Sequence, residues 1–203
     1  ATLTIPTGKG PYPAVVLVHG SGPNDRDESV GAAKPFRDLA LGLAALGIAT
    51  LRYDKRTRVH GNQMKEWPTL AEETVDDAVF AIDYLRTQGG PAIDSRRLFV
   101  LGHSMGGKLI PQIAARSPHA KGFISMAGST QPLEDIIVYQ REYLRSVDGE
   151  LCETDRKQIA ELKRLAALIK SGDFSQTGAR PMGIAVKAWR EWNAYRPAVA
   201  AQQ

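Results

Sequence analysis

The chain has 203 residues, 43% hydrophobic and 24% charged, a composition typical of a globular domain with one hydrophobic core. Its formal net charge is +4, but the basic residues are scattered among acidic ones, which argues against a nucleic-acid partner. The single cysteine, Cys152, excludes a disulfide framework and a cysteine-based zinc site. No apolar run reaches the roughly 18 residues that a membrane-spanning helix needs.

Strands and helices alternate in the first part of the chain. Apolar or alternating runs predict strands at 2–5, 13–19, 48–53, 97–102 and 122–127. Several are continuous, such as A-V-V-L-V, which suits a sheet covered on both faces. Helical patterns lie between them at 34–46, 69–87 and 105–116, and this alternation predicts parallel strands joined by helical crossovers. Thr69 and Glu72 have the spacing of a capping box, and Pro111 should kink the third helix or remove one of its hydrogen bonds.

The alternation stops after Gly128. The remaining pattern predicts three helices, at 132–147, 154–171 and 181–195. One face of the second helix is apolar, formed by Ile159, Leu162, Leu165, Ala166 and Ile169. In the third, Trp189, Trp192 and Tyr195 recur every three residues. We interpret this stripe as core-facing, with the wall of a pocket as the alternative.

A serine lies at a predicted turn from strand to helix. Residues 100–107 read V-L-G-H-S-M-G-G, with a glycine two positions on either side of Ser104. Such a serine needs a sharp, strained backbone turn, and side chains at Gly102 or Gly106 would collide with the neighbouring strand and helix. An ordinary glycine-rich turn and a phosphate-binding turn are the alternatives, but the spacing of Lys108 does not fit a Walker A motif. We therefore predict that Ser104 is a nucleophile.

An earlier strand ends in a glycine loop that can supply an oxyanion hole. Residues 15–23 read V-V-L-V-H-G-S-G-P. We predict that the backbone amides of Ser21 and Met105 bind the oxyanion, with Gly22 as the alternative to Ser21. For His19 we favour a role in bracing this loop over one in proton transfer.

Three segments carry a resemblance to a known family. V-L-V-H-G-S-G-P, L-R-Y-D-K-R and G-H-S-M-G occur in an order that resembles the alpha/beta-hydrolase fold. Within that superfamily, H-G-S-G-P-N-D-R-D and K-P-F-R-D-L-A are similar to a bacterial esterase group described as dienelactone-hydrolase-like or prolyl-oligopeptidase-like. The resemblance implies an α/β fold, a mostly parallel sheet with helices on both faces and a helical cap. It divides the chain into the N-terminal part of the core (1–128), the cap (129–196) and the start of a return to the core (197–203).

The resemblance also implies an activity. It implies a serine hydrolase that cleaves carboxylic esters through an acyl-enzyme, and this chemistry needs no metal or organic cofactor. The apolar stripes of the cap suggest a small-molecule substrate, an acyl or aryl ester. A peptidase or thioesterase on the same scaffold is an alternative, and a non-catalytic binding module is another if the chain ends at Gln203. The related group implies a bacterial protein and favours export, but the sequence leaves the compartment open.

The general base and its acid are not evident in the sequence. The family order places them after the nucleophile, on loops that follow two further strands. Of His19, His60, His103 and His119, only His119 follows Ser104, and its loop is expected at the far end of the sheet. Asp135 could substitute for the acid. We therefore expect the base and acid to lie beyond Gln203, and the chain to lack its first and last strands. The open edge at 122–127 is then expected to be completed by a second fragment or another copy of the chain.

Several charged and polar residues could support the site. Asp54 follows a strand, where open sheets form their sites, but we expect it to brace loops and to pair with Arg52, Lys55 or Arg56. His103, beside Ser104, is a further candidate for a pocket or supporting role. The segment 24–27 either shapes the entrance of the pocket or forms pairs within itself.

Overall fold

The computed structural model describes residues 1–64, 68–147, 149–178 and 180–202, so Gln203, the last residue of the predicted segment 197–203, lies outside the described part. The chain forms two compact units. The first comprises Ala1–Ser129 together with Pro197–Gln203, and the second comprises Thr130–Arg196. We describe each unit by itself.

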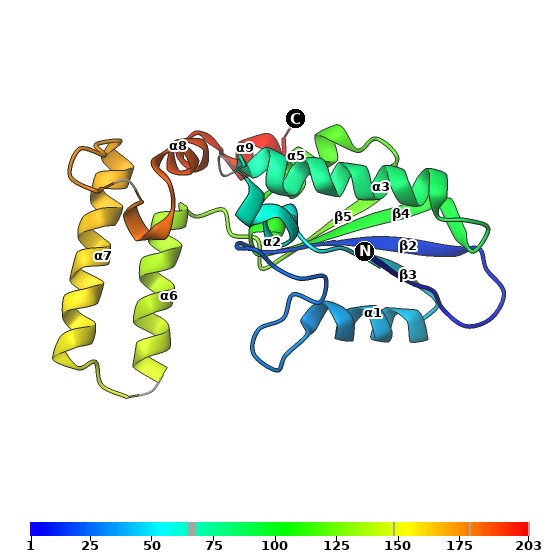
Figure 1. Cartoon of the computed structure of the whole chain (residues 1–203), viewed down its shortest axis with the longest axis horizontal. Helices are drawn as coiled ribbons and strands as arrows, with labels where there is room; N and C mark the ends of the chain where they lie inside the picture. The colour runs from blue at the N-terminus through cyan, green and yellow to red at the C-terminus, as the bar shows by residue number, and fades with distance from the viewer. Residues whose placement is uncertain (65–67, 148, 179, 203) are drawn as a thin grey trace. The chain divides into compact units, whose positions relative to one another are not determined.

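A five-stranded sheet forms the first unit (Figure 1). Its strands are β1 (Thr2–Thr4), β2 (Tyr12–Val18), β3 (Ala49–Arg52), β4 (Ile93–His103) and β5 (Ala120–Met126). Their order is β1-β3-β2-β4-β5, and only β1 runs antiparallel to its neighbour in this described sheet. β5 forms one edge, where Ile124 is 48% exposed.

Helices cover both faces of this sheet (Figure 1). Helix α1 (Pro35–Ala45) packs on one face, where Val15, Leu17, Phe36 and Leu101 form a buried cluster. Helices α3 (Asp76–Gln88) and α5 (Ile110–Arg116) cover the other face. The prediction of a mostly parallel sheet with helices on both faces is confirmed. Shorter turns complete the unit: α2 (Arg56–His60), η1 (Gly61–Gln63), η2 (Ala71–Val75), α4 (Met105–Lys108) and α9 (Pro197–Ala200).

Two predicted helices differ from the structure in detail. The helix predicted at 69–87 begins with the π-helical turn η2 before α3. Its capping box is confirmed, because the amide of Thr69 donates to Oε2 of Glu72 at 2.8 Å and the amide of Glu72 donates to Oγ1 of Thr69 at 3.1 Å. The helix predicted at 105–116 is interrupted at Leu109. Pro111 is the second residue of α5, where an amide would have no partner within the helix, so it removes no hydrogen bond.

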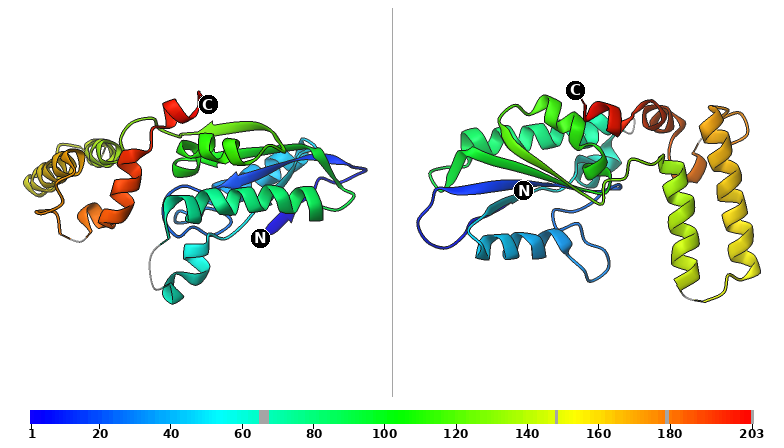
Figure 2. Two further views of the ribbon diagram at one scale, coloured as in Figure 1. Left: turned by 90° about the horizontal axis from the view of Figure 1, so that it is seen from above. Right: turned by 180° about the vertical axis from the view of Figure 1, so that it is seen from behind.

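In the described part of the second unit, the regular elements are all helices. It contains α6 (Leu133–Val147), α7 (Glu153–Ser171), η3 (Pro181–Gly183) and α8 (Val186–Ala194). Helices α6 and α7 lie side by side (Figure 2). The single helix predicted at 181–195 is wrong in its first turn, because Met182 and Gly183 have positive φ values of 53° and 79°. Whether this unit caps the site stays a prediction.

Apolar stripes of the second unit face inward. Ile159, Ala166 and Ile169 are buried on α7, as the helical spacing predicts. Trp189 and Trp192 are buried on α8, and the indole Nε1 of Trp189 donates to the carbonyl of Pro181 at 2.9 Å. This burial favours the core-facing interpretation of the stripe.

Within the described parts of the chain, no helix is both long and apolar enough to cross a bilayer.

Candidate active site

The backbone of Ser104 has the conformation expected of a nucleophile elbow. Ser104 lies between β4 and α4 with φ of 52° and ψ of −110°, values that residues with a side chain rarely adopt. Two hydrogen bonds hold this turn, from the amide of Ser104 to the carbonyl of Met126 (2.9 Å) and from the amide of Gly106 to the carbonyl of His19 (3.1 Å). The turn therefore presents Ser104 at the carboxyl edge of the parallel strands.

Glycines allow the elbow to pack closely. A Cβ atom on Gly102 would overlap the carbonyl group of Gly106 and lie 2.7 Å from the amide nitrogen of Gly107. A Cβ atom on Gly106 would lie 2.5 Å from the carbonyl oxygen of Val18. Neither position has room for a side chain, which is the steric reason for the G-x-S-x-G spacing.

The glycine loop after β2 lies beside the serine. A Cβ atom on Gly20 would be 3.2 Å from Cβ of Ser104. Within the described residues, the backbone amides of Ser21 and Met105 donate no hydrogen bond, so both remain available to a ligand. Gly22, the alternative donor, has φ of 90°, a left-handed value that favours glycine.

Buried charged side chains hold the Gly20 residue from two sides. Its carbonyl accepts hydrogen bonds from Nζ of Lys55 (2.7 Å) and Nδ2 of Asn24 (3.2 Å). Its amide donates to Oε1 of Glu28 at 2.5 Å, and the other carboxylate oxygen of Glu28 lies 2.9 Å from Nδ1 of His103. His103 is thereby linked to the glycine loop. Glu28 was not predicted from the sequence, because its backbone φ of 52° and its contact with Gly20 leave no local pattern.

Asp54 pairs with Arg26, which the sequence did not predict. Its carboxylate accepts from the backbone amide of Arg26 (2.9 Å) and from the guanidinium Nη2 of Arg26 (2.5 Å). These Arg26 hydrogen bonds hold the pKa of Asp54 below its usual range. The expectation that Asp54 pairs with Arg52, Lys55 or Arg56 is therefore wrong, although its contacts do brace a loop.

The three expected partners bind elsewhere. Arg52 forms an ion pair with Asp27, while the ammonium of Lys55 lies 3.6 Å from the carboxylate of Glu73. Arg56 forms an ion pair with Asp77 at 2.5 Å. The segment 24–27 thus makes most of its polar contacts with the ends of strands and with the glycine loop, and few within itself.

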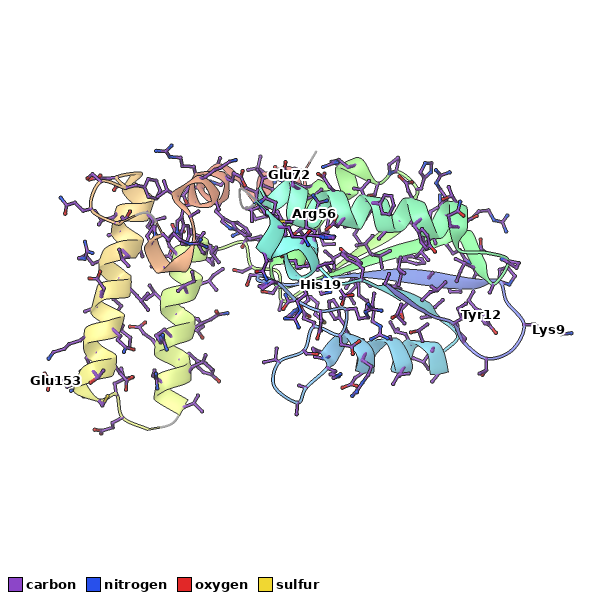
Figure 3. The ribbon with its side chains drawn as sticks, viewed as in Figure 1. Lys9, Tyr12, His19, Arg56, Glu72 and Glu153 are labelled. Carbon is purple, nitrogen blue, oxygen red and sulfur yellow. The ribbon has the colours of Figure 1, made fainter. Side chains whose placement is uncertain are left out.

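His19 is a buried residue at the end of β2, at the same end of the sheet as Arg56 of α2 (Figure 3). Its ring packs 5.2 Å from the ring of Phe36 and 5.1 Å from that of Tyr53. Burial, and then the charge of Lys55, lower the pKa of His19 from 6.5 to about 4. A ring that stays neutral and packed suits the bracing role.

No histidine is hydrogen-bonded to Ser104 in the described part of the chain. The Ser104 hydroxyl has no hydrogen-bond partner there. His119 is exposed and directly precedes β5, so it lies at the edge of the sheet opposite Ser104. His60 is exposed at the end of α2, and Asp135 pairs with Lys170 at 2.6 Å in the second unit. In the described part of the chain, no cluster of histidine, cysteine or carboxylate side chains could hold a metal ion.

Comparison with known proteins identifies a family for most of the chain. Residues 15–202 match the Alpha/beta hydrolase family. Esterase EstD of Thermotoga maritima is 47% identical over 148 residues, which are 71% of this chain and 34% of EstD, so the chain spans about a third of that relative. The structure of the alpha/beta hydrolase GrgF from Penicillium sp. sh18 matches with a TM-score of 0.57 and 16% identity, over 98% of this chain and 70% of GrgF.

A second solved structure has the same fold. The 2,6-dihydroxy-pseudo-oxynicotine hydrolase matches with a TM-score of 0.52 and 22% identity, over 77% of this chain and 42% of that protein. At these identities the two structures support the fold alone.

Proposed function

Since this chain belongs to the alpha/beta hydrolase family, we propose that it is a serine hydrolase that cleaves carboxylic esters through an acyl-enzyme intermediate. The observation that carries the proposal is the strained backbone of Ser104, with the amides of Ser21 and Met105 left without hydrogen-bond partners in the described structure. The likeness to an esterase, EstD, supports the ester as the bond cleaved.

The proposed reaction has two steps. Oγ of Ser104 attacks the ester carbonyl and loses its proton to a general base, and the amides of Ser21 and Met105 stabilise the negative carbonyl oxygen. The bond to the alcohol then breaks, and the alkoxide takes the proton from the base as the acyl-enzyme forms. Water, activated by the same base, attacks the acyl-enzyme, releases the carboxylic acid and restores Ser104.

We propose that the base and its acid come from residues outside these 203. His119 lies at the wrong edge of the sheet, His19 is buried with a pKa of about 4, and within the described residues Ser104 forms no hydrogen bond with His103. Experiments on activity therefore call for the full-length protein.

The substrate is proposed to be a small-molecule ester, and the helical unit 130–196 is proposed to act as a cap. Thioesterases and peptidases use the same arrangement of nucleophile and oxyanion hole. A panel of ester, thioester and amide substrates with the same acyl group separates these activities, and we expect kcat/KM to be highest for the ester.

Covalent labelling tests the nucleophile directly. We expect a fluorophosphonate probe to add one adduct to the full-length protein, as measured by intact mass, and peptide mapping to locate it on Ser104. The Ser104→Ala variant should lose both the adduct and ester hydrolysis, by about 10³-fold or more. The matched control Ser146→Ala removes an exposed hydroxyl of the second unit and should change neither. An adduct on another residue, or full activity in Ser104→Ala, contradicts the proposal.

A further inference from the structure

Lys55 is a buried cation that contacts the glycine loop, and the proposed reaction gives it no role. Its side chain is 1% exposed, and its ammonium donates to the carbonyl of Gly20 at 2.7 Å. Its counter-ion is Glu73, 3.6 Å away and also buried, and Oγ1 of Thr57 donates to the same carboxylate at 2.5 Å. Because burying a charge costs several kcal/mol unless partners compensate, this arrangement calls for an explanation.

The geometry of the peptide unit links Lys55 to the oxyanion hole. In a trans peptide, the carbonyl of Gly20 and the amide N–H of Ser21 lie in one plane and point in opposite directions. A cation that fixes the direction of the Gly20 carbonyl therefore also fixes the direction of the Ser21 N–H. Asn24 supports the same orientation, since its Nδ2 donates to the carbonyls of both Gly20 and Ser21, at 3.2 and 3.0 Å.

The position of this peptide makes its orientation important. Gly20 lies close to Ser104, since a Cβ atom added to it would be 3.2 Å from Cβ of Ser104. On the amino side, Glu28 holds the amide of Gly20 at 2.5 Å, so that residue cannot turn independently of the loop. A charged donor on the carbonyl also polarises the peptide unit, which makes the N–H of Ser21 a stronger donor.

We propose that Lys55 is a positioning residue for the oxyanion hole: its ammonium holds the Gly20–Ser21 peptide so that the Ser21 N–H faces the site of the developing negative charge, and it strengthens that donor. This inference rests on the proposed function, because it assumes that the Ser21 amide binds the oxyanion. The opposing interpretation is that Lys55 only neutralises Glu73 and stabilises the fold.

Replacing Lys55 by an apolar side chain of similar length separates the two roles. In full-length Lys55→Met we expect kcat to fall by about 10- to 100-fold with little change in KM, because loss of a whole oxyanion donor costs about 10²- to 10³-fold. The affinity for a trifluoromethyl ketone, which forms a tetrahedral adduct with the serine, should fall by a similar factor. The matched control Arg56→Met removes the next cation and its ion pair with Asp77, and should leave kcat unchanged.

The pH dependence of kcat supplies a second readout, which remains decisive if Lys55→Met does not fold. Burial lowers the pKa of Lys55, and the charges of Glu73, Glu28 and Asp77 oppose this effect, while His19 also faces the ammonium. We expect kcat to decline at alkaline pH as Lys55 loses its proton. Glu73→Gln removes the nearest carboxylate and should move this decline to lower pH.

The outcomes distinguish this inference from the proposed function. Suppose that Ser104 is labelled and required for activity. If Lys55→Met then keeps kcat and the inhibitor affinity, or if Glu73→Gln does not move the alkaline decline of kcat, the positioning role is refuted and the serine hydrolase stands. If Ser104 is neither labelled nor required, the proposed function fails and this inference fails with it.

Discussion

Lowering the pH should destabilise the protein through His19. The folded state holds the pKa of His19 at about 4, whereas the unfolded chain has the ordinary value of 6.5. Below pH 6.5 the unfolded state therefore binds a proton that the folded state does not bind, so the free energy of unfolding falls as the pH drops from 6.5 towards 4. A pKa difference of about 2.5 corresponds to about 3 kcal/mol at the acid end of this window.

The matched variant for this test is His19→Phe, which keeps an aromatic ring beside Phe36 and Tyr53 but cannot titrate. Urea unfolding, followed by circular dichroism at pH 7 and pH 4, gives the free energy for each protein. Carboxylates titrate in both, so their contribution cancels in the comparison. We expect the wild type to lose about 3 kcal/mol more than the variant between these two pH values.

Two results would refute this reasoning. One is an equal loss of stability in the wild type and in His19→Phe. The other is a pKa near 6.5 for the folded protein when the His19 ring protons are followed by NMR as the pH is lowered. Either result would mean that the ring is solvated in the folded state and that burial does not control its charge.

Two further substitutions test the packing of the elbow and the role of Asp54. Gly102→Ala should destabilise the protein by about 3 kcal/mol or more, because its Cβ overlaps the carbonyl group of Gly106. The control Gly42→Ala, at an open position of α1, should stabilise the protein by about 0.5–1 kcal/mol. Similar melting temperatures for the two variants would contradict this reasoning. Asp54→Asn should weaken the pair with Arg26 and lower the free energy of unfolding by about 1 kcal/mol in a urea titration. We expect kcat to fall less than tenfold, and a fall in kcat above 10³-fold would instead assign Asp54 to catalysis.

The sequence was most informative where a feature depends on neighbours along the chain. The period of apolar residues predicted the strands and the covered sheet, because burial on one face or both leaves a regular pattern. The spacing around Ser104 predicted the elbow. Gly102 is required by the backbone of Gly106 and Gly107, one turn away, whereas Gly106 is required by the carbonyls of Val18 and His19 on a distant strand. The capping box at Thr69 is local in the same sense. The regular helix predicted at 181–195 failed in its first turn, where two positive φ values interrupt it.

Contacts between distant segments could not be predicted in this way. From the sequence, Lys55 was expected only as a partner for Asp54, but its ammonium donates to the carbonyl of Gly20, 35 positions earlier. Arg26 reaches Asp54 across 28 positions, and Glu28 meets His103 because the loop after β2 folds back over the carboxyl edge of the sheet. The sequence by itself determined most of the strands and helices and the strained turn at Ser104, because those depend largely on local sterics and periodic burial. Only the tertiary structure decided which charges meet, because partner choice depends on the path of the loops through space.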